Sequence, residues 1–404
     1  MTESTPSIRR RQLLAGSASA IAAAGLTGLS GRAVAQSATA SAAKPLPAYA
    51  TFKDPSAVIV HSSNTIETKR SAFGTSVITP AEQLYVRNNV APPDASILAD
   101  RDAWQVSIEG VRTPRTLSVG ELKTMGIETV AMVLQCSGNG RGFFQHKTSG
   151  TQWQVGAAGC VIWSGVPVRY VVAALGGPVA GMNYLTGTGG EKLPAGIDPL
   201  TVIVERSLPL QAMDHALLAW EMNGSPIPLA HGGPLRLVVP GYQGVNNIKY
   251  VKRVAFTPAE TKAAIMDHRY RLAPIGGKAT SAMPSVLGLT VKSFVTSPSG
   301  DMTEKAGTIY VTGVAFSGGS PIKRVEVSSD GGKTWMDASF IGPDLGPFAW
   351  RQFALPLKMA PGNYVVTSRA TDAAGNVQPQ LRMENAAGYA NSSWADHAVK
   401  VAVA

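Results

Sequence analysis

Cys136 is the residue of this sequence whose setting most favours chemistry. The segment 132–141 reads Met-Val-Leu-Gln-Cys-Ser-Gly-Asn-Gly-Arg, which predicts an apolar strand that ends in a turn at the cysteine. Gly138 and Gly140 would let the backbone approach a bulky group closely. Soft metals prefer soft thiolate ligands, and Arg141 would favour the thiolate or hold an anion beside it. These residues alone leave two roles open, a reactive or metal-binding cysteine and a structural cysteine.

The second cysteine, Cys160, allows another fate for both thiols. It lies in the apolar segment 157–163, which predicts a buried strand where a small thiol is an inert core residue. In an oxidising compartment the two cysteines could instead form a disulfide. The residues alone do not decide between these two outcomes.

The elements that must position Cys136 are mostly short strands. From residue 85 onward the sequence predicts strands at 104–108, 130–134, 201–204 and 235–240. Helical signals are fewer, with a capped start at 118–122 and a short apolar helix at 168–175. Gly and Pro interrupt these segments repeatedly. The pattern predicts an α+β fold, mainly β, with many loops that could hold a large cofactor.

The pattern changes after 274–285, a segment rich in Gly, Pro, Ser and Ala. Evenly spaced strand-like segments follow at 307–314, 324–328, 348–353, 363–370 and 398–403. Their spacing, without helices, predicts an immunoglobulin-like β-sandwich from about residue 286. Within it, 328–335 (Ser-Ser-Asp-Gly-Gly-Lys-Thr-Trp) fits a box typical of sialidase propellers. The box occurs once, so we interpret it as a structural hairpin.

The N-terminal residues predict export. A basic run, Arg9 to Arg11, precedes a stretch of small apolar residues, and Ala-Val-Ala at 33–35 precedes Gln36. This is the pattern of a twin-arginine signal peptide with its cleavage site, so we predict a signal peptide at 1–36 and a periplasmic protein. That route carries folded proteins, often with a cofactor already inserted. No later apolar run of about 20 residues occurs, so no membrane span is expected in the mature chain.

The net charge narrows the classes of partner. The formal charge of +10 falls to +7 when the four arginines and one glutamate of the predicted leader are removed. Such a charge suits an anionic substrate, an acidic protein partner or solubility. No tract combines dense Lys and Arg with aromatic residues, so no nucleic acid is expected as a partner.

The cysteine segment resembles the signature of the sulfite oxidase family, whose cysteine binds molybdenum in the molybdopterin cofactor. Other segments resemble the family in the same order, at 85–89, 221–224, 231–236, 247–250, 317–319, 325–335 and 372–379. The resemblance runs from about residue 85 to the C-terminus. It implies a sulfite-oxidase-type molybdopterin domain at 37–285 and a dimerisation domain at 286–404, and therefore a homodimer.

The resemblance also implies roles for single residues. The metal ligand would be Cys136. The catalytic candidates at the substrate pocket would be Arg87, Arg141, Trp153 and Tyr270. The cofactor-binding candidates would be Tyr85, Val86, Arg87, Asn88, Asn89, Cys136, His231, Arg236, Asn247, Ile248 and Lys249. The two guanidinium groups of Arg87 and Arg141 would suit a sulfite dianion. Outside this context, such arginines are usually surface ion-pair residues. A tryptophan such as Trp153 or a histidine such as His231 is then usually structural.

Three positions depart from the family's pattern. Asn89 replaces the usual histidine, Ser149 stands where vertebrate members carry a pocket lysine, and Ala387 lies near where they carry a further arginine. The pocket is therefore expected to be less cationic, and a titratable ring is missing. The resemblance also argues against a disulfide between Cys136 and Cys160, because that bond would remove the metal ligand.

The implied function is a periplasmic sulfite dehydrogenase that oxidises sulfite to sulfate. No C-x-x-C-H motif occurs and the stretch before residue 85 is too short for a haem b domain, so no haem is expected in this chain. The electrons would then pass to another protein, with a c-type cytochrome as the expected acceptor. The alternatives are a sulfane dehydrogenase subunit of a thiosulfate-oxidising system, a methionine sulfoxide reductase, which the second β domain argues against, and a non-enzymatic β-sandwich binding module.

Overall fold

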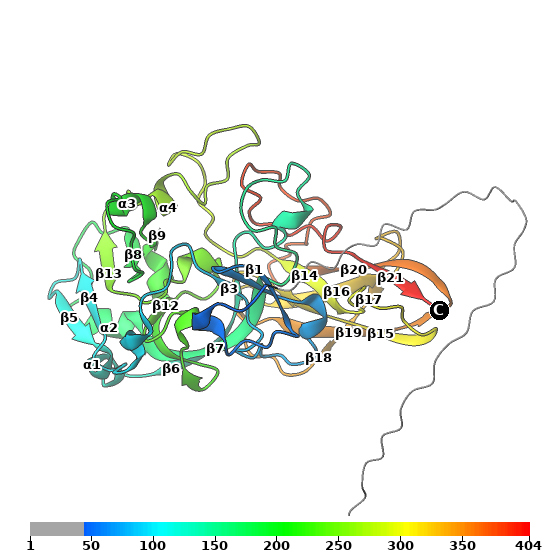
Figure 1. The fold of residues 1–404 in the computed structure, drawn as a ribbon, viewed down its shortest axis with the longest axis horizontal. Coiled ribbons are helices and arrows are strands. Elements are labelled where there is room, and N and C mark those ends of the chain that lie inside the picture. The colour runs from blue at the N-terminus through cyan, green and yellow to red at the C-terminus, as the bar shows by residue number, and fades with distance from the viewer. Residues whose placement is uncertain (1–43) are drawn as a thin grey trace, which may run out of the picture. The chain divides into compact units, whose positions relative to one another are not determined.

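The computed structural model describes residues 44–404, which form one unit of the chain. The predicted signal peptide lies outside the described residues. No helix in the described part combines the length and the apolar character that a membrane crossing requires. Strands dominate, and the few helices are short (Figure 1). This is the mainly β, α+β fold that the sequence predicts.

Three sheets make up the first part of the described chain. The first is antiparallel and consists of β1 (Val58–Ser62), β2 (Thr65–Thr68) and β3 (Val86–Arg87). The second has the order β11-β10-β7-β6, with β12 also paired to β10. Its strands are β6 (Glu128–Gln135), β7 (Ala158–Pro167), β10 (Leu217–Met222), β11 (Ser225–Pro226) and β12 (Arg236–Val238).

The third sheet has the order β5-β4-β13-β8-β9, and its β4 and β13 run parallel. Its strands are β4 (Gln105–Glu109), β5 (Arg115–Ser118), β8 (Tyr184–Thr188), β9 (Glu205–Pro209) and β13 (Arg253–Thr257). The largest apolar core gathers buried side chains from these strands, from the second sheet and from α2 (Val168–Ala174). The two five-stranded sheets therefore share one core, and loops at their strand ends are free to form a site.

Short helices connect the strands. The remaining α-helices are α1 (Val119–Lys123), α3 (Pro199–Val202) and α4 (Ala264–Asp267). The 3₁₀ helices are η1 (Ala48–Ala50), η2 (Arg70–Ala72), η3 (Ala95–Leu98), η4 (Arg141–Phe143), η5 (Leu210–Asp214), η6 (Leu229–His231) and η7 (Gly244–Asn246).

Two helices confirm the sequence prediction and one corrects it. α1 begins with a full capping box, in which the side chains of Ser118 and Glu121 each bind the other's backbone N–H. α2 occupies the predicted apolar helix. The predicted strand at 201–204 is wrong, because α3 ends only at Val202. Asp198 caps that helix and Pro199 begins it, and these two start signals outweigh the β-branched residues that follow.

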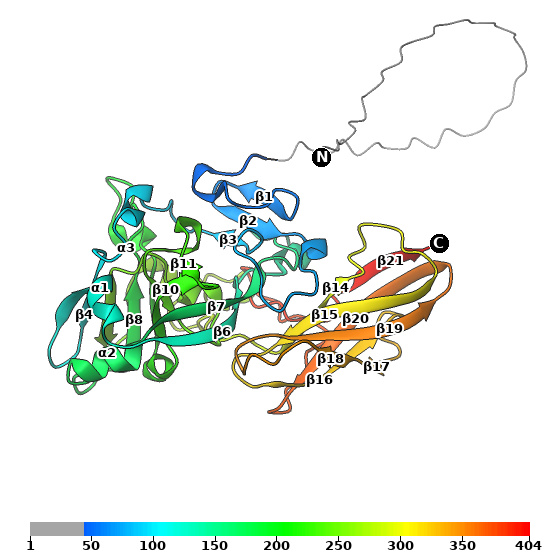
Figure 2. The same ribbon diagram turned by 90° about the horizontal axis from the view of Figure 1, so that it is seen from below.

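The second part is a β-sandwich (Figure 2). Its sheets have the orders β14-β15-β19-β18 and β17-β16-β20-β21, and their facing apolar side chains form a separate core. The strands are β14 (Lys292–Ser297), β15 (Gly307–Phe316), β16 (Ile322–Ser328), β17 (Met336–Asp337), β18 (Ser339–Ile341), β19 (Arg351–Met359), β20 (Gly362–Asp372) and β21 (Val399–Val403). The sandwich is therefore confirmed, while the boundary at residue 286 stays a prediction.

Two details of the sandwich bear on the sequence predictions. The segment 328–335 is the hairpin between β16 and β17, and the Asp330 carboxylate accepts hydrogen bonds from the backbone of Lys333 and Thr334. The predicted strand at 348–353 starts later, at Arg351. The residues before it contact the first part instead: Phe348 O accepts from the backbone N–H of Val133 in β6. This contact ties the sandwich to the strand that leads to Cys136.

Candidate functional site

The two cysteines lie on neighbouring strands but in different surroundings. Cys136 directly follows β6, donates its backbone N–H to Ala157 O over 2.9 Å, and lines a cavity. Cys160 lies within β7 opposite Val133, and burial raises the pKa of its thiol to about 12. The two residues belong to different apolar clusters, and both are free thiols. Cys136 is therefore the thiol that faces open space.

Most of the residues predicted for the site line this same cavity. They come from loops far apart in the sequence, which the two five-stranded sheets and the small first sheet bring together. The predicted residues in the cavity wall are Tyr85, Arg87, Asn88, Asn89, Cys136, His231, Arg236, Asn247, Lys249 and Tyr270. Val86 and Ile248 belong instead to the apolar clusters beneath the wall.

Three of these residues carry cationic or imidazole groups and form what we call the cavity floor: His231, Arg236 and Lys249. The Arg236 guanidinium donates to His231 O over 2.8 Å and to Asn247 O over 3.2 Å. The Lys249 ammonium donates to Ala230 O and to Asn88 Oδ1, each over 2.6 Å. None of these acceptors is a carboxylate. Arg236 and Lys249 are therefore held by groups that carry no negative charge.

The floor is electrostatically unfavourable until an anion binds. Burial lowers the pKa of Arg236 to about 10. Burial also lowers the pKa of Lys249, and the neighbouring Arg236 lowers it further. The pKa of His231 falls well below its ordinary value, first through burial and then through Lys53 and Lys249. Cations held close together in a poorly solvated site attract an anion strongly. The floor is suited to a phosphate or another anionic group.

A second group of wall residues, which we call the cavity rim, consists of Arg87, Asn89 and Tyr270. Arg87 is half-buried and donates to the backbone O of Asn88. The Tyr270 hydroxyl donates to Asn89 Oδ1 over 3.1 Å. The φ of Tyr270 is 51°, a left-handed conformation that is uncommon outside glycine and is found at functional sites. The rim thus offers a guanidinium, an amide and a phenol to a second ligand.

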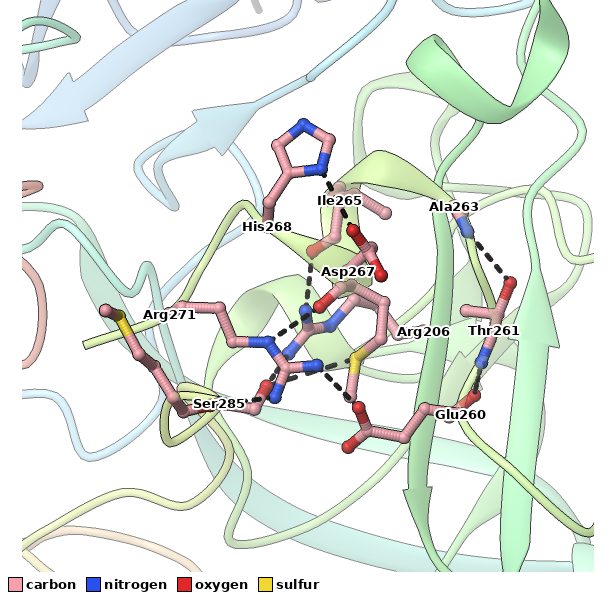
Figure 3. Close-up of polar contacts among 12 residues, drawn as sticks. Arg206, Glu260, Thr261, Ala263, Ile265, Asp267, His268, Arg271 and Ser285 are labelled. Carbon is pink, nitrogen blue, oxygen red and sulfur yellow. Dashed lines mark hydrogen bonds and ion pairs between the residues drawn. The ribbon is translucent and has the colours of Figure 1, made fainter. Parts of the chain in front are cut away.

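A buried polar network supports the segment that carries Tyr270 (Figure 3). The Arg206 guanidinium donates to Asn246 Oδ1, Ile265 O and Ser285 Oγ, and lies 5.8 Å from the centre of the Tyr270 ring. Next to it, Arg271 donates to Met266 O and Met283 O and pairs with Glu260. Both arginines are at least 96% buried by exposed area, so the loop behind Tyr270 is held at several points.

The second part of the chain also reaches the rim. The ring of Tyr389 stacks on that of Tyr270, with centroids 4.9 Å apart and planes 13° apart. Arg141 lies 5.2 Å from the centre of the Tyr389 ring and donates to Ala387 O and Thr151 O. Arg141 does not line the cavity wall, so its contribution to anion binding stays a prediction. Its position shows that it fastens the cysteine loop to the 387–390 segment.

Trp153 is fully buried behind Tyr85, with the two ring centroids 6.3 Å apart, and it is not part of the cavity wall. Its indole N–H has no hydrogen-bond partner within the described residues. The His61 ring also packs against it in a T-shaped arrangement, with centroids 5.3 Å apart. Trp153 is therefore close enough to support Tyr85, while its predicted contact with substrate stays untested.

Sequence reasoning missed Glu191, an acid in the cavity wall. It follows two glycines after β8, and burial raises the pKa of its carboxyl to about 7, with Lys249 acting in the opposite direction. Its Oε2 is buried and has no hydrogen-bond partner within residues 44–404. Tyr389 was missed as well. Neither residue lies in a recognisable motif, so only the spatial arrangement reveals them.

Comparison with known proteins places this geometry in a family. Residues 93–265 match the family model described as oxidoreductase molybdopterin binding domain, and residues 284–403 match the Mo-co oxidoreductase dimerisation domain. The sulfite oxidase of Gallus gallus is 30% identical over 78% of this chain and 72% of its own length. The chain belongs to the sulfite oxidase family.

Other relatives agree with this assignment. The mitochondrial sulfite oxidase of Macaca fascicularis is 32% identical over 81% of this chain, and the match spans 62% of that relative's length. A chain in the crystal structure of the sulfane dehydrogenase SoxCD from Paracoccus pantotrophus superposes with a TM-score of 0.71. The superposition covers 85% of this chain and 88% of that one, at 25% identity. The sulfite-oxidase-type fold with its dimerisation domain is therefore confirmed.

The residues of the cavity fit the family's molybdopterin cofactor. Four wall residues hold buried polar atoms with no partner in the described part of the chain: Asn88 Nδ2, Ser137 Oγ, Glu191 Oε2 and Arg236 Nε. Such atoms are rare in folded proteins, and a ligand with matching groups would satisfy them. A side chain at Gly244 would come within 2.8 Å of the Tyr85 hydroxyl. The thiol, the cationic floor and the unpaired donors together suit a metal cofactor with an anionic arm.

Proposed function

We propose that the protein is a periplasmic sulfite dehydrogenase, which oxidises sulfite to sulfate with a molybdopterin-bound molybdenum and passes the electrons to a c-type cytochrome. The observation that carries the proposal is the cavity whose wall brings together Cys136, the cationic floor and the rim residues Arg87 and Tyr270. Family membership supports the cofactor, and the predicted leader supports the compartment. The match to a dimerisation domain supports a homodimer.

Each side of the cavity has its own task in this proposal. The Cys136 thiolate would bind the molybdenum, since a soft metal prefers a soft ligand. His231, Arg236 and Lys249 would hold the anionic part of the cofactor. When bound, the cofactor would supply a metal able to accept two electrons and to transfer an oxygen atom to the substrate.

The rim residues would act on the substrate. Arg87 would bind the sulfite anion through charge-assisted hydrogen bonds, which are roughly twice as strong as neutral ones. The Tyr270 hydroxyl has a single O–H, which Asn89 Oδ1 accepts at 3.1 Å in the structure. When substrate binds, this O–H would turn from Asn89 to a substrate oxygen. A phenol that donates in this way orients an oxyanion without changing the net charge of the site.

The proposal is tested by comparing two single-thiol variants of the exported holoprotein. We expect the wild type to contain molybdenum and to reduce a c-type cytochrome when sulfite is added. Cys136→Ser is expected to abolish the reduction, because a serine hydroxyl is a poor ligand for a soft metal. Cys160→Ala, which removes the thiol from the neighbouring strand, is the matched control and should retain both molybdenum and activity. Sulfite-dependent reduction by Cys136→Ser at the wild-type rate would contradict the assignment.

A second candidate is a sulfane dehydrogenase subunit that acts on sulfur bound to a carrier protein. The similarity to the SoxCD chain over most of both chains favours it. The same holoprotein distinguishes the two candidates. Turnover of free sulfite supports the sulfite dehydrogenase, whereas turnover restricted to a persulfide on a carrier cysteine supports the alternative. A non-enzymatic binding module is disfavoured, because the family match covers both parts of the chain.

A further inference from the structure

Lys53 is a buried lysine beside the cofactor cavity, and it lies outside the range that the molybdopterin-domain model matches. Only 2% of its surface is exposed. It follows η1, and its ammonium group contacts three acceptors: Ala81 O, Leu84 O and, at 2.8 Å, His231 Nε2. A lysine ammonium has three N–H donors and no acceptor. The geometry therefore satisfies the charged form of Lys53 completely.

His231 is the residue through which Lys53 reaches the cavity. The ring is 99% buried by exposed area, and burial together with the surrounding cations keeps the pKa of His231 well below its ordinary value. The imidazole is therefore neutral and carries a single N–H, on one nitrogen or the other. A donor-only ammonium at Nε2 requires that nitrogen to accept, so the proton resides on Nδ1. The described residues provide no hydrogen bond to Nδ1, and His231 lines the cavity.

We propose that Lys53 is a positioning residue that holds His231 in the Nδ1–H tautomer, so that the ring presents a hydrogen-bond donor to the anionic arm of the cofactor. The proposal rests on the cofactor site of the proposed function. The other tautomer would present a lone pair to an anion, which is repulsive. The contact with Lys53 thus selects the form of the ring that binds.

The competing arrangement is a neutral Lys53 amine that accepts a hydrogen bond from His231 Nε2–H. Burial lowers the pKa of Lys53 and favours that arrangement, whereas the nearby Glu82 carboxylate opposes it. A bound anion adds negative charge beside the floor and shifts the balance toward the ammonium. The two arrangements place the ring proton on different nitrogens, so one measurement separates them.

The experiment is a long-range ¹H–¹⁵N correlation spectrum of the holoprotein labelled with ¹⁵N-histidine. The sequence contains six histidines, and the His231 signals are assigned by their loss in His231→Gln. We expect the pattern of the Nδ1–H tautomer for His231 in the wild type. The pattern of the Nε2–H tautomer in the wild-type holoprotein would overturn the proposal, whatever the behaviour of any variant.

Lys53→Met removes the donor while keeping a chain of similar length. His231 Nε2 is then free to donate to Ala81 O, which lies 3.4 Å away. We expect the ring to change to the Nε2–H tautomer and the molybdenum content per chain to fall about tenfold, the typical cost of losing an outer-shell partner. An unchanged tautomer in a folded Lys53→Met protein would contradict the proposal.

Two further variants separate positioning from simple loss of stability. Lys53→Arg keeps a donor-only cation and is expected to keep the Nδ1–H tautomer. Lys292→Met removes another buried lysine, which donates to Asn391 O in the second part of the chain, and should leave both tautomer and molybdenum content unchanged. A protein that shows these tautomers but does not oxidise sulfite would refute the proposed reaction alone, because the tautomer does not depend on turnover.

Discussion

The floor and the rim of the cavity differ in how their polar groups are held. On the floor, Arg236 and Lys249 donate to backbone carbonyls and an amide, which fix their positions without neutralising their charge. On the rim, Tyr270 and Asn89 bind each other and carry no charge, and Arg87 is the one cation among the three rim residues. A constrained cationic surface suits a resident cofactor, whereas a surface with one cation and an uncharged pair can change with the substrate. The family resemblance should accordingly be stronger evidence for the cofactor than for the substrate.

The largest effect is expected from removing charge on the floor. Arg236→Met deletes the guanidinium that bridges His231 O and Asn247 O, leaving two buried carbonyls unpaired at a cost of about 1–3 kcal/mol each. It also removes a cation from the anion site. We expect the molybdenum content of the purified protein to fall more than about tenfold. Arg236→Lys keeps the charge and should retain more metal, and equal loss in both variants would show that charge is not what the floor supplies.

An intermediate effect is expected on the rim. Tyr270→Phe removes the hydroxyl that binds Asn89 but keeps the ring that stacks on Tyr389. We expect kcat/KM for sulfite to fall about tenfold, equivalent to about 1.4 kcal/mol of transition-state stabilisation, with normal molybdenum content. Metal analysis and steady-state kinetics on the same preparation check both points. Loss of metal in this variant would erase the distinction between floor and rim.

A smaller effect is expected from restoring the family's histidine at the rim. In Asn89→His a protonated ring would add positive charge beside the anionic substrate, and that charge is lost as the pH rises through the ordinary histidine pKa of about 6.5. The KM of the variant relative to wild type should therefore be lowest at acid pH and rise a few-fold toward pH 8. Dividing the KM of the variant by the KM of the wild type at each pH cancels the effect of sulfite's own ionisation. A ratio that does not change with pH would show that position 89 lies too far from the bound anion.

The fold was predictable where local signals agreed with the packing. The capping box at Ser118 and the evenly spaced strands after residue 286 both specify their structure within a short stretch. The strand predicted at 201–204 failed because Asp198 and Pro199, just upstream, start a helix there. The strand-like composition of the four residues 201–204 did not outweigh those two helix-starting residues.

The site was predictable only where motifs contribute directly to the wall. Cys136, Arg236 and Lys249 do so: Cys136 directly follows β6, Arg236 begins β12, and all three line the cavity. The neighbours that support or complete the wall, among them Lys53 and Tyr389, come from segments whose contact depends on how distant loops meet. Nothing in their local sequence indicates that contact. Glu191 belongs to the same group and provides the last prediction.

Glu191 is the acid in a wall that also contains the cationic side chains of Arg87, Arg236 and Lys249, and its effect should be on stability. Burial raises the pKa of its carboxyl to about 7, above the ordinary value of 4.5. Between these two values the unfolded chain loses its proton while the folded chain keeps it, so this group makes the protein less stable as the pH rises from about 4.5 through 7. Glu191→Gln removes this contribution. The Tm of the variant, relative to wild type, should therefore increase across that pH range by a few degrees at most, because the side chain is half-buried and partly screened. Scanning calorimetry of both proteins at several pH values checks the sign. A Tm difference between variant and wild type that falls as the pH rises would mean that Lys249 stabilises the ionised carboxylate more than burial disfavours it. The Glu191 carboxylate, rather than a bound anion, would then neutralise the positive charge of the floor.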